Sequence, residues 1–214
     1  MSRPTTRTYA MTARAEGAEA TRERIARCAL ELLFEQWFED VTLTAIARAA
    51  GVSHQTVLNH FASKEGVLLA AAEVLSAETH AARGRARPGD VKGAVRILVG
   101  EYERFGDANA RWAATSERLG SLAPLLDEAR AGHQTWLGHV FGPRLPAAPA
   151  RRRRAINALH AATDVYTWKL LRRDLGLTRA ETERTMVGLA IGVLDPPPDD
   201  DSAVPPSPRT KETR

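Results

Sequence analysis

The chain has 214 residues, and its 43% of hydrophobic and 26% of charged residues are typical of a folded globular protein. The formal net charge of +4 at pH 7 indicates a polyanionic partner only weakly, because residues 1–64 carry eight Lys and Arg against seven Asp and Glu. A single cysteine, Cys28, excludes an intrachain disulfide framework, and the lack of a signal peptide or a long apolar run predicts a cytoplasmic protein.

The two ends of the chain differ in composition from its middle. Residues 1–19 are polar or small, and we expect them to form a flexible arm. Residues 195–214 combine clustered prolines with acidic residues and few apolar side chains, which predicts a disordered tail. No segment between them shows the sustained alternation of apolar and polar residues that is typical of strands. The sequence therefore predicts an all-α fold.

The first part of this helical region predicts four helices in quick succession. From about Thr21 to Gln36, apolar residues recur at the spacing of one face of an amphipathic helix. Small polar residues of the type that begins helices then occur at Thr42, Ser53 and Ser63. The helix that begins at Ser63 is predicted to be long and to end near Gly84.

Further helices are predicted in the second part of the chain, where Gly, Pro and capping residues separate apolar periodic segments. Among these separators we include Gly106 and Gly120. The predicted helices lie near residues 90–106, 109–119, 122–141, 148–174 and 179–194.

Residues 43–61 have the layout of a helix-turn-helix, with Gly51 at the position where the first helix ends. Val57 and Phe61 are spaced to face the core, which leaves the polar side chains of residues 54–56, 59 and 60 on the exposed faces of the second helix. Gln and Asn can each form paired hydrogen bonds with adenine, and Thr can contact a base through its hydroxyl or methyl group. These residues predict a helix that reads DNA. The alternative is a solvent-exposed helical hairpin within an ordinary bundle.

Residues 22–75 resemble the DNA-binding domain of the TetR family of bacterial transcriptional regulators. The resemblance spans the opening helix "RIARCALELLFEQWF", the segment "VTLTAIARAAGVS", a recognition helix ending in "HF", and "SKEGVLL" at the start of the fourth helix. It implies a helix-turn-helix domain joined by a long helix to a C-terminal effector-binding and dimerisation domain. The DNA-contact positions of the family fall here on Thr42, Thr44, Ser53, His54, Gln55, Thr56, Leu58, Asn59, His60 and Lys64.

Three residues depart from the family pattern. Leu58 stands where Tyr is common and cannot donate a hydrogen bond to phosphate. His54 stands where Lys is frequent and is mostly uncharged near neutral pH. Trp37 replaces a Gly that usually precedes an aromatic residue. The first two departures place more of the recognition on the other polar side chains of the reading helix.

Apolar residues at helical spacing form a stripe on each of the last two long helices, which favours a four-helix interface between two chains. A dimer also supplies the two reading heads that a palindromic operator requires. The alternative is that both stripes serve only the core of one chain. The predicted dimer residues are Ile156, Leu159, Thr163, Tyr166, Leu170, Met186, Leu189, Ala190 and Val193.

Aromatic side chains interspersed with His and Asp occur between the reading domain and the dimer helices. Aromatic walls with a few polar groups suit a flat or lipophilic small molecule, although each of these residues could instead belong to the core. The predicted effector-binding residues are Tyr102, Phe105, Trp112, His133, Trp136, His160, Asp164 and Trp168.

Other chemistry is poorly supported by the sequence. The run of arginines at 151–154 covers every side of a helical turn and is interpreted as a solvated helix start. The six His residues lack metal-ligand spacing, and neither a Gly-rich phosphate loop nor a nucleophile elbow occurs, so we expect no metal, no cofactor and no enzymatic activity.

We therefore expect a homodimeric repressor, released from a palindromic double-stranded DNA operator by a small aromatic or lipophilic effector. The alternatives are an activator, a regulator without an effector, or a helical enzyme or small-molecule-binding protein that has lost DNA recognition. The predicted domains are a flexible arm at residues 1–19, the DNA-binding domain at 20–66, the effector-binding and dimerisation domain at 67–194, and the tail at 195–214.

Overall fold

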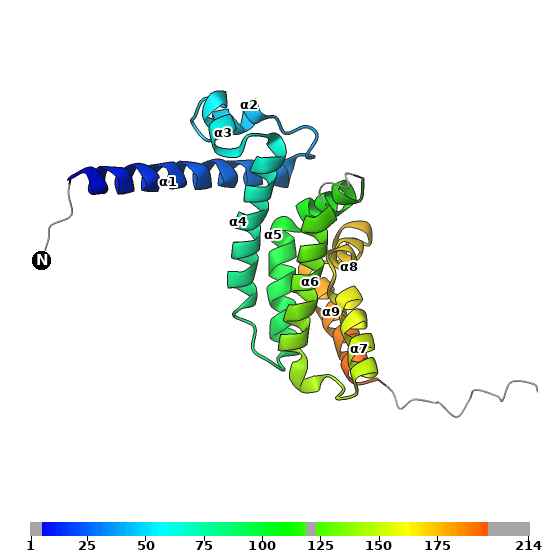
Figure 1. Ribbon diagram of the computed structural model, residues 1–214. Helices are drawn as coiled ribbons and strands as arrows, with labels where there is room; N and C mark the ends of the chain where they lie inside the picture. The colour runs from blue at the N-terminus through cyan, green and yellow to red at the C-terminus, as the bar shows by residue number, and fades with distance from the viewer. Residues whose placement is uncertain (1–5, 119–122, 197–214) are drawn as a thin grey trace, which may run out of the picture.

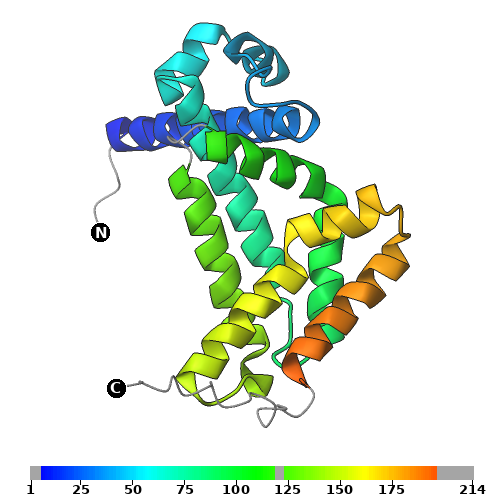
Figure 2. The same ribbon diagram turned by 90° about the vertical axis from the view of Figure 1, so that its right-hand side faces the viewer.

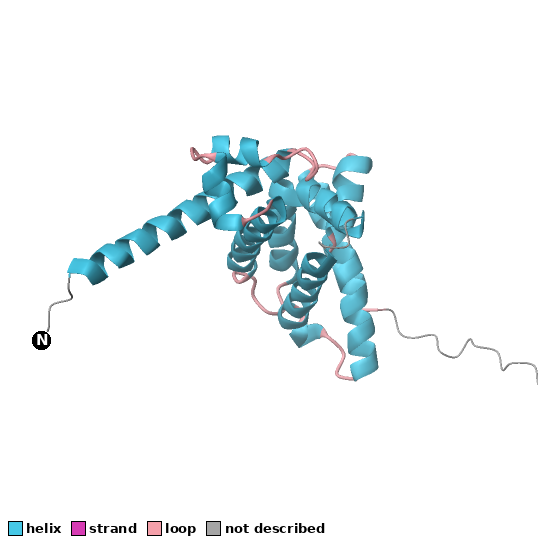
Figure 3. Ribbon diagram, turned by 45° about the horizontal axis from the view of Figure 1, so that its top comes forward, coloured by secondary structure: helices cyan, strands magenta, loops and turns pink. Residues whose placement is uncertain are grey.

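The computed structural model describes residues 6–118 and 123–196, and side chains within 15–114 and 123–196. These residues form helices and connecting turns without a strand, which confirms the predicted all-α fold (Figures 1 and 3). Within the same ranges, no helix is both long enough and apolar enough to cross a membrane. The predicted disordered tail lies, beyond Pro196, outside the described residues.

The N-terminal part contains four helices, and the last three of them start directly after the predicted capping residues. The side-chain oxygens of Thr42, Ser53 and Ser63 each accept a hydrogen bond from a backbone N–H three residues later, which satisfies one of the free donors of a helix start. The long fourth helix ends at Gly84, where its end was predicted. The helices are α1 (Thr6–Glu35), α2 (Leu43–Ala49), α3 (His54–Phe61) and α4 (Lys64–Arg83).

Helix α1 begins much earlier than its predicted start at Thr21, so most of the predicted arm is helical. After Pro4 the segment contains no further proline and is rich in alanine, the residue with the highest helix propensity. In Figure 1, the blue N-terminal half of α1 projects beyond the helices that pack on its other half.

The first hydrophobic core lies where α1 crosses α4, with α2 and α3 packed on the crossing. It includes Val67, Leu68 and Ala71 of α4, so this core extends past the predicted domain boundary at residue 66. The other buried side chains that fill it are Ile25, Ala29, Leu33, Ile46, Ala47, Val57 and Phe61.

The C-terminal part is a bundle in which α5 packs against α6, α8 and α9, and α7 lies beside α9 (Figure 2). Its core is filled mainly by Leu98, Tyr102, Leu137, Phe141, Leu159, Trp168 and Met186. The elements are α5 (Val91–Arg118), α6 (Ala123–Val140), the short 3₁₀ helix η2 (Gly142–Arg144), α7 (Pro149–Thr163), α8 (Val165–Lys169), the π-helical turn η3 (Leu170–Asp174) and α9 (Arg179–Leu194).

Gly106 does not end a helix, and the two helices predicted at 90–106 and 109–119 are one continuous α5. The glycine instead allows the Trp168 indole to approach the helix. A Cβ atom at position 106 would lie far inside van der Waals contact with Trp168 Cζ3. Position 106 therefore requires a glycine, but the reason is close packing against Trp168 and not a break in the helix.

The single helix predicted at 148–174 is divided at Asp164. Asp164 has an extended backbone, with φ −69° and ψ 153°, and its carboxylate accepts a hydrogen bond from the Tyr166 N–H at 2.8 Å. This aspartate therefore caps α8 and prevents α7 from continuing. The π-helical turn η3 then changes the direction in which the following side chains point.

Candidate functional site

The helix-turn-helix formed by α2 and α3 is held in place by two arginines of α1. Arg24 Nε donates to the Ala50 carbonyl at the end of α2, and Arg22 Nη1 donates to the His60 carbonyl near the end of α3, each at 3.1 Å. The Arg22 guanidinium also lies over the Phe61 ring, 4.6 Å from its centroid. Gly51 between the two helices has φ +64°, the left-handed conformation predicted from its position.

Helix α3 buries Val57 and Phe61 and leaves a polar outer face. His54, Gln55 and Asn59 are exposed, whereas the Thr56, Leu58 and His60 positions are partly buried. Gln55 Nε2 donates to Asn59 Oδ1 at 2.9 Å, so the two amides are already aligned along the helix. Their remaining donors and acceptors point away from the core, as paired contacts with base edges require.

The predicted contacts at helix starts have local roles in the free protein. Thr42 and Ser53 cap α2 and α3, and the Ser53 and Thr56 hydroxyl groups share a hydrogen bond of 2.8 Å. Lys64 Nζ donates to the Glu39 carbonyl at 3.3 Å and lies 4.2 Å from the Phe38 ring centroid. Partial burial lowers the pKa of Lys64 from its usual value.

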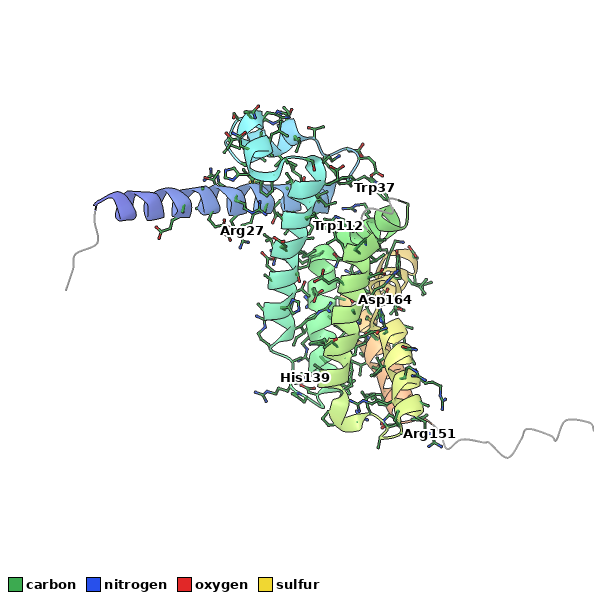
Figure 4. All side chains as sticks on the ribbon, in the orientation of Figure 1. Arg27, Trp37, Trp112, His139, Arg151 and Asp164 are labelled. Carbon is green, nitrogen blue, oxygen red and sulfur yellow. The ribbon has the colours of Figure 1, made fainter. Side chains whose placement is uncertain are left out.

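The departures from the family pattern have different consequences. Trp37 follows the end of α1 (Figure 4), and its carbonyl accepts hydrogen bonds from the N–H groups of Asp40 and Val41. Among the described residues other than glycine, only Ala62 has a positive φ, so the Trp37 position does not need glycine. Leu58 has no polar group to offer to a phosphate.

Residues 25–71 match the family model described as bacterial regulatory proteins, tetR family. Over 154 residues the chain is 36% identical to the HTH-type transcriptional regulator TcmR of Streptomyces glaucescens, a match that covers 60% of this chain and 67% of TcmR. The chain belongs to the TetR family. It is therefore a DNA-binding transcriptional regulator and not an enzyme.

Solved structures of several other proteins share the fold. A TetR-family regulator from Streptomyces coelicolor superposes with a TM-score of 0.69 at 20% identity, over 82% of this chain and 80% of that one. A transcriptional regulator from Rhodococcus sp. Rha1 gives 0.67 at 19% identity, over 81% and 95%. The multidrug binding protein EbrR, solved in complex with imidazole, gives 0.56 at 19% identity, over 78% and 88%.

In this TetR-family chain, a buried ion pair lies at the end of α4 that is farther from the helix-turn-helix. Arg83 Nε and Nη2 donate to the two carboxylate oxygens of Glu101 at 2.9 and 2.8 Å, and the two side chains are only 14% and 4% exposed. Burial alone would lower the pKa of Arg83, but the Glu101 carboxylate outweighs it and raises this pKa. Two parallel charge-assisted hydrogen bonds fix the guanidinium in one orientation.

His133 of α6 extends this pair to α7. A guanidinium can only donate, so Arg83 Nη1 donates to His133 Nδ1 at 3.1 Å, and the proton of the neutral ring must lie on Nε2. Nε2 then donates to Thr163 Oγ1 at 3.0 Å, and Thr163 donates to the Leu159 carbonyl. Burial, followed by the nearby Arg83 charge, lowers the pKa of His133 to about 3.

We call Arg83, Glu101, Tyr102, His133 and Thr163 the Arg83 cluster. Tyr102 completes it, because its hydroxyl donates to the Thr163 carbonyl at 2.9 Å. The cluster connects α4, α5, α6 and α7 through hydrogen bonds between its side chains and to the backbone of α7.

Several of the predicted effector-binding residues gather around this cluster. The Trp136 ring stacks 6.0 Å from His133, and its Nε1 donates to the Arg83 carbonyl at 3.1 Å. The His160 ring lies 4.9 Å from His133, and its Nε2 is 3.4 Å from Asp164 Oδ2. Burial acts to raise the pKa of Asp164, but hydrogen bonds from His160 and the Tyr166 N–H lower it overall.

Other predicted effector-binding residues lie elsewhere. Phe105 stacks on Phe34 of α1 with a centroid distance of 5.0 Å, and Trp112 packs against the N-terminal core (Figure 4). Trp168 contacts the Tyr102 ring but is fully buried, with its Nε1 bound to Glu103. Phe105 and Trp112 therefore join the two parts of the chain, and Trp168 fills the C-terminal core.

Sequence reasoning did not select Arg83 or Glu101, and it placed Thr163 in the dimer face. A signal for Glu101 was present, because Ala94, Leu98, position 101 and Phe105 form one apolar stripe in which a carboxylate is unexpected. A buried carboxylate on such a stripe requires a cation, here Arg83. No group of His, Cys, Asp and Glu within the described ranges is arranged to hold a metal ion.

The predicted dimer face is only partly available to a partner. Leu159, Thr163, Met186 and Ala190 are fully buried within the single chain and belong to its own core. On the first stripe, α7 ends at Thr163, and the turn at Asp164 together with η3 separates Tyr166 and Leu170 from the buried face of Leu159 and Thr163. The exposed apolar side chains are Tyr166, Leu170 and Leu189, at 44%, 49% and 45%, whereas Ile156 and Val193 are partly buried.

The aligned amides of α3 generate a prediction about base reading. Replacing both Gln55 and Asn59 by Ala should cost about 1–3 kcal/mol of base discrimination per residue, because each amide can form paired bonds with a base. Neither side chain contributes to the core, so folding should be unaffected. Binding to matched and single-mismatch duplexes measures the discrimination. Unchanged discrimination would remove these residues from the reading surface.

The neutral state of His133 predicts a pH dependence of stability. An unfolded His titrates near 6.5, whereas the pKa of folded His133 is lowered to about 3, so the unfolded chain binds one more proton between these values. Stability should therefore fall as pH decreases through this window, by up to about 1.4 kcal/mol per pH unit from this residue. His133→Gln should show a flatter dependence in urea unfolding between about pH 7 and pH 5.

The control for this measurement is His139→Gln, which removes an exposed histidine of the same helix. Its unfolding free energy should follow that of the unaltered protein at both pH values. An equal pH dependence for His133→Gln and the unaltered protein would contradict the buried, neutral state of His133.

Proposed function

We propose that this regulator is a homodimeric repressor that leaves a palindromic operator when a small aromatic or lipophilic effector binds beside the Arg83 cluster. The observation that carries this proposal is the position of α4. Its first turns belong to the core of the helix-turn-helix domain, and its last turn carries Arg83. Any change at the cluster can therefore alter the pose of the reading head through one rigid helix.

The DNA-binding part of the proposal assigns two kinds of contact. Gln55, Thr56 and Asn59 read base edges in the major groove, because they lie along the outer part of α3. The helix starts at Thr42 and Ser53 offer hydroxyl and backbone N–H groups to phosphates. Thr44, His54, His60 and Lys64 complete the polar contact surface, and Leu58 can contribute only apolar contact.

The dimer part of the proposal uses the face formed by α8, η3 and α9. Tyr166, Leu170 and Leu189 are exposed there, and apolar side chains of this size favour contact with a second chain. Gly188 and Gly192 of α9 have open space where a side chain would stand, so a partner helix can approach closely. Two copies related by a twofold axis would present two α3 helices to successive major grooves.

The effector part of the proposal rests on the chemistry around the Arg83 cluster. Trp136, His133 and His160 supply flat ring surfaces, and Arg83 supplies donors that an incoming acceptor could use. EbrR, which has the same fold, was solved with the flat ligand imidazole. An effector that binds better when Arg83 is separated from Glu101 or His133 shifts the population toward a released state of α4.

Selection of bound duplexes from a random DNA pool tests the regulator as a dimer. We expect an enriched palindrome with half-site centres about 34–36 Å apart, or a multiple of this distance. Repeating the selection at two salt concentrations separates specific binding from phosphate attraction. An enriched single half-site would contradict the dimer, and sequence-independent binding alone would contradict the reading surface.

Glu101→Gln tests the coupling through α4. Breaking a buried ion pair costs about 3–5 kcal/mol, so the end of α4 should loosen. We expect operator affinity without effector to fall about 5- to 150-fold, the usual range of allosteric coupling. Glu183→Gln is the matched control, because it pairs with Arg96, whose side chain is 66% exposed, and it should leave affinity unchanged.

Thr163→Val is a milder second variant, since it keeps the ion pair and the side-chain shape but removes the acceptor for His133. It should reduce operator affinity less than Glu101→Gln and remain informative if that variant unfolds. Circular dichroism establishes that each variant is folded. Folded cluster variants with unchanged operator affinity would refute coupling through Arg83 and leave DNA recognition intact.

A further inference from the structure

One face of α5 carries two carboxylates that hold α8 and η3 in place. Glu103, Gly106 and Asp107 lie three or four residues apart, so they share one side of this helix. We propose that Glu103, assisted by Asp107, is a positioning residue that fixes the pose of the dimer face. The inference rests on the proposed homodimer and does not involve the effector.

Glu103 binds both α8 and η3. The Arg172 guanidinium donates to its two carboxylate oxygens, from Nε at 2.7 Å and from Nη2 at 3.0 Å. The Trp168 indole Nε1 donates to the first of these oxygens at 3.1 Å. Arg172 Nη1 also donates to the Leu177 carbonyl at 2.9 Å, shortly before α9 begins. A single carboxylate therefore holds α8, η3 and the approach to α9.

The wide turn of η3 directs two successive arginines at α5 (Figure 2). A backbone hydrogen bond of 2.9 Å joins residues five apart, as in a π-helix. Such a turn holds more residues than an α-helical turn, so neighbouring side chains diverge less around the axis. Arg172 thereby reaches Glu103, while Arg173 donates to Asp107 from Nε at 3.1 Å and from Nη2 at 2.9 Å.

The Trp168 indole fits closely between these ion pairs. It is fully buried, and its ring meets α5 at Gly106, where a Cβ atom would overlap it. The Arg173 guanidinium lies over the same ring, 4.8 Å from its centroid. Because apolar burial is not directional, the paired hydrogen bonds at Glu103 and Asp107 are what fix the register of the segment on α5.

The opposite side of the segment contributes to the proposed dimer face. Trp168 and Leu171 are buried, whereas Leu170 is 49% exposed. A loosened clamp lets the segment shift on α5, which moves Leu170 out of the pose that fits a second chain. Only chains in the competent pose can pair. The apparent dissociation constant of the dimer therefore rises by the inverse of the competent fraction, once for each chain.

Glu103→Gln tests the inference, because it keeps the size of the side chain but removes the charge and one acceptor. If about a tenth to a third of the variant chains keep the competent pose, the dissociation constant of the dimer should rise about 10- to 100-fold. Sedimentation equilibrium of the full-length protein measures this constant, and circular dichroism establishes that the variant is folded.

Asp107→Asn is a milder second variant, which remains informative if Glu103→Gln unfolds. The Arg173 and Asp107 side chains are 37% and 47% exposed, against 22% and 21% for Arg172 and Glu103. The dissociation constant should therefore rise less, about two- to fivefold.

Asp174→Asn is the matched control. Asp174 belongs to the same turn, but it pairs with Lys169 of α8 at 2.9 Å instead of with α5. Its replacement should leave the dissociation constant of the dimer unchanged. A rise equal to that of Glu103→Gln would mean that any lost charge in this turn weakens the dimer, and it would overturn the role of Glu103.

A double variant separates positioning from a general loss of stability. In a Leu170→Ala background, Glu103→Gln should have an effect about threefold smaller or less, because Glu103 acts through the face to which Leu170 belongs. Independent effects of the two substitutions would contradict the inference, as would an unchanged dissociation constant for folded Glu103→Gln and Asp107→Asn. An unaltered protein that remains monomeric would instead refute the dimer, and the inference with it.

Discussion

The structure depends most on the bidentate ion pair between Arg83 and Glu101. Two charges removed from water are tolerable only if every remaining donor and acceptor is satisfied, because desolvation otherwise exceeds the attraction. That condition explains the surroundings of the pair. His133 must stay neutral to accept from Arg83, and Thr163 must accept from its other nitrogen. Four helices are thereby fixed to one guanidinium at the end of α4.

A second set of contacts joins the two parts of the chain near the other end of α4. Phe34 stacks on Phe105, and the Arg111 guanidinium donates to the Phe34 carbonyl. Farther along α4, in its second half, Glu78 lies near Arg104 of α5 and Arg27 of α1. Helix α4 is thus restrained at both ends, by the apolar contacts of its first turns in the N-terminal core and by the cluster at Arg83. Because a helix is rigid, a change in the contacts at one end can shift the group that is held at its other end.

The sequence predicted features that depend on neighbouring residues and missed those that depend on distant ones. The capping residues Thr42, Ser53 and Ser63 were predicted correctly, because a cap is a local hydrogen bond. Gly106 was misinterpreted because its reason is the Trp168 ring, which lies far along the chain. The burial of Met186 and Ala190 could likewise not be predicted from the sequence, since an apolar stripe suits a core as well as an interface.

The same distinction applies to the functional surfaces. The reading helix could be recognised because its polar residues follow one another within a few positions, whereas the Arg83 cluster is assembled from four helices. The helical part of the predicted arm was missed for another reason. Residues 6–19 were expected to be flexible because they are polar or small, but a segment rich in alanine and without an internal proline favours a helix even where it has no apolar face to bury.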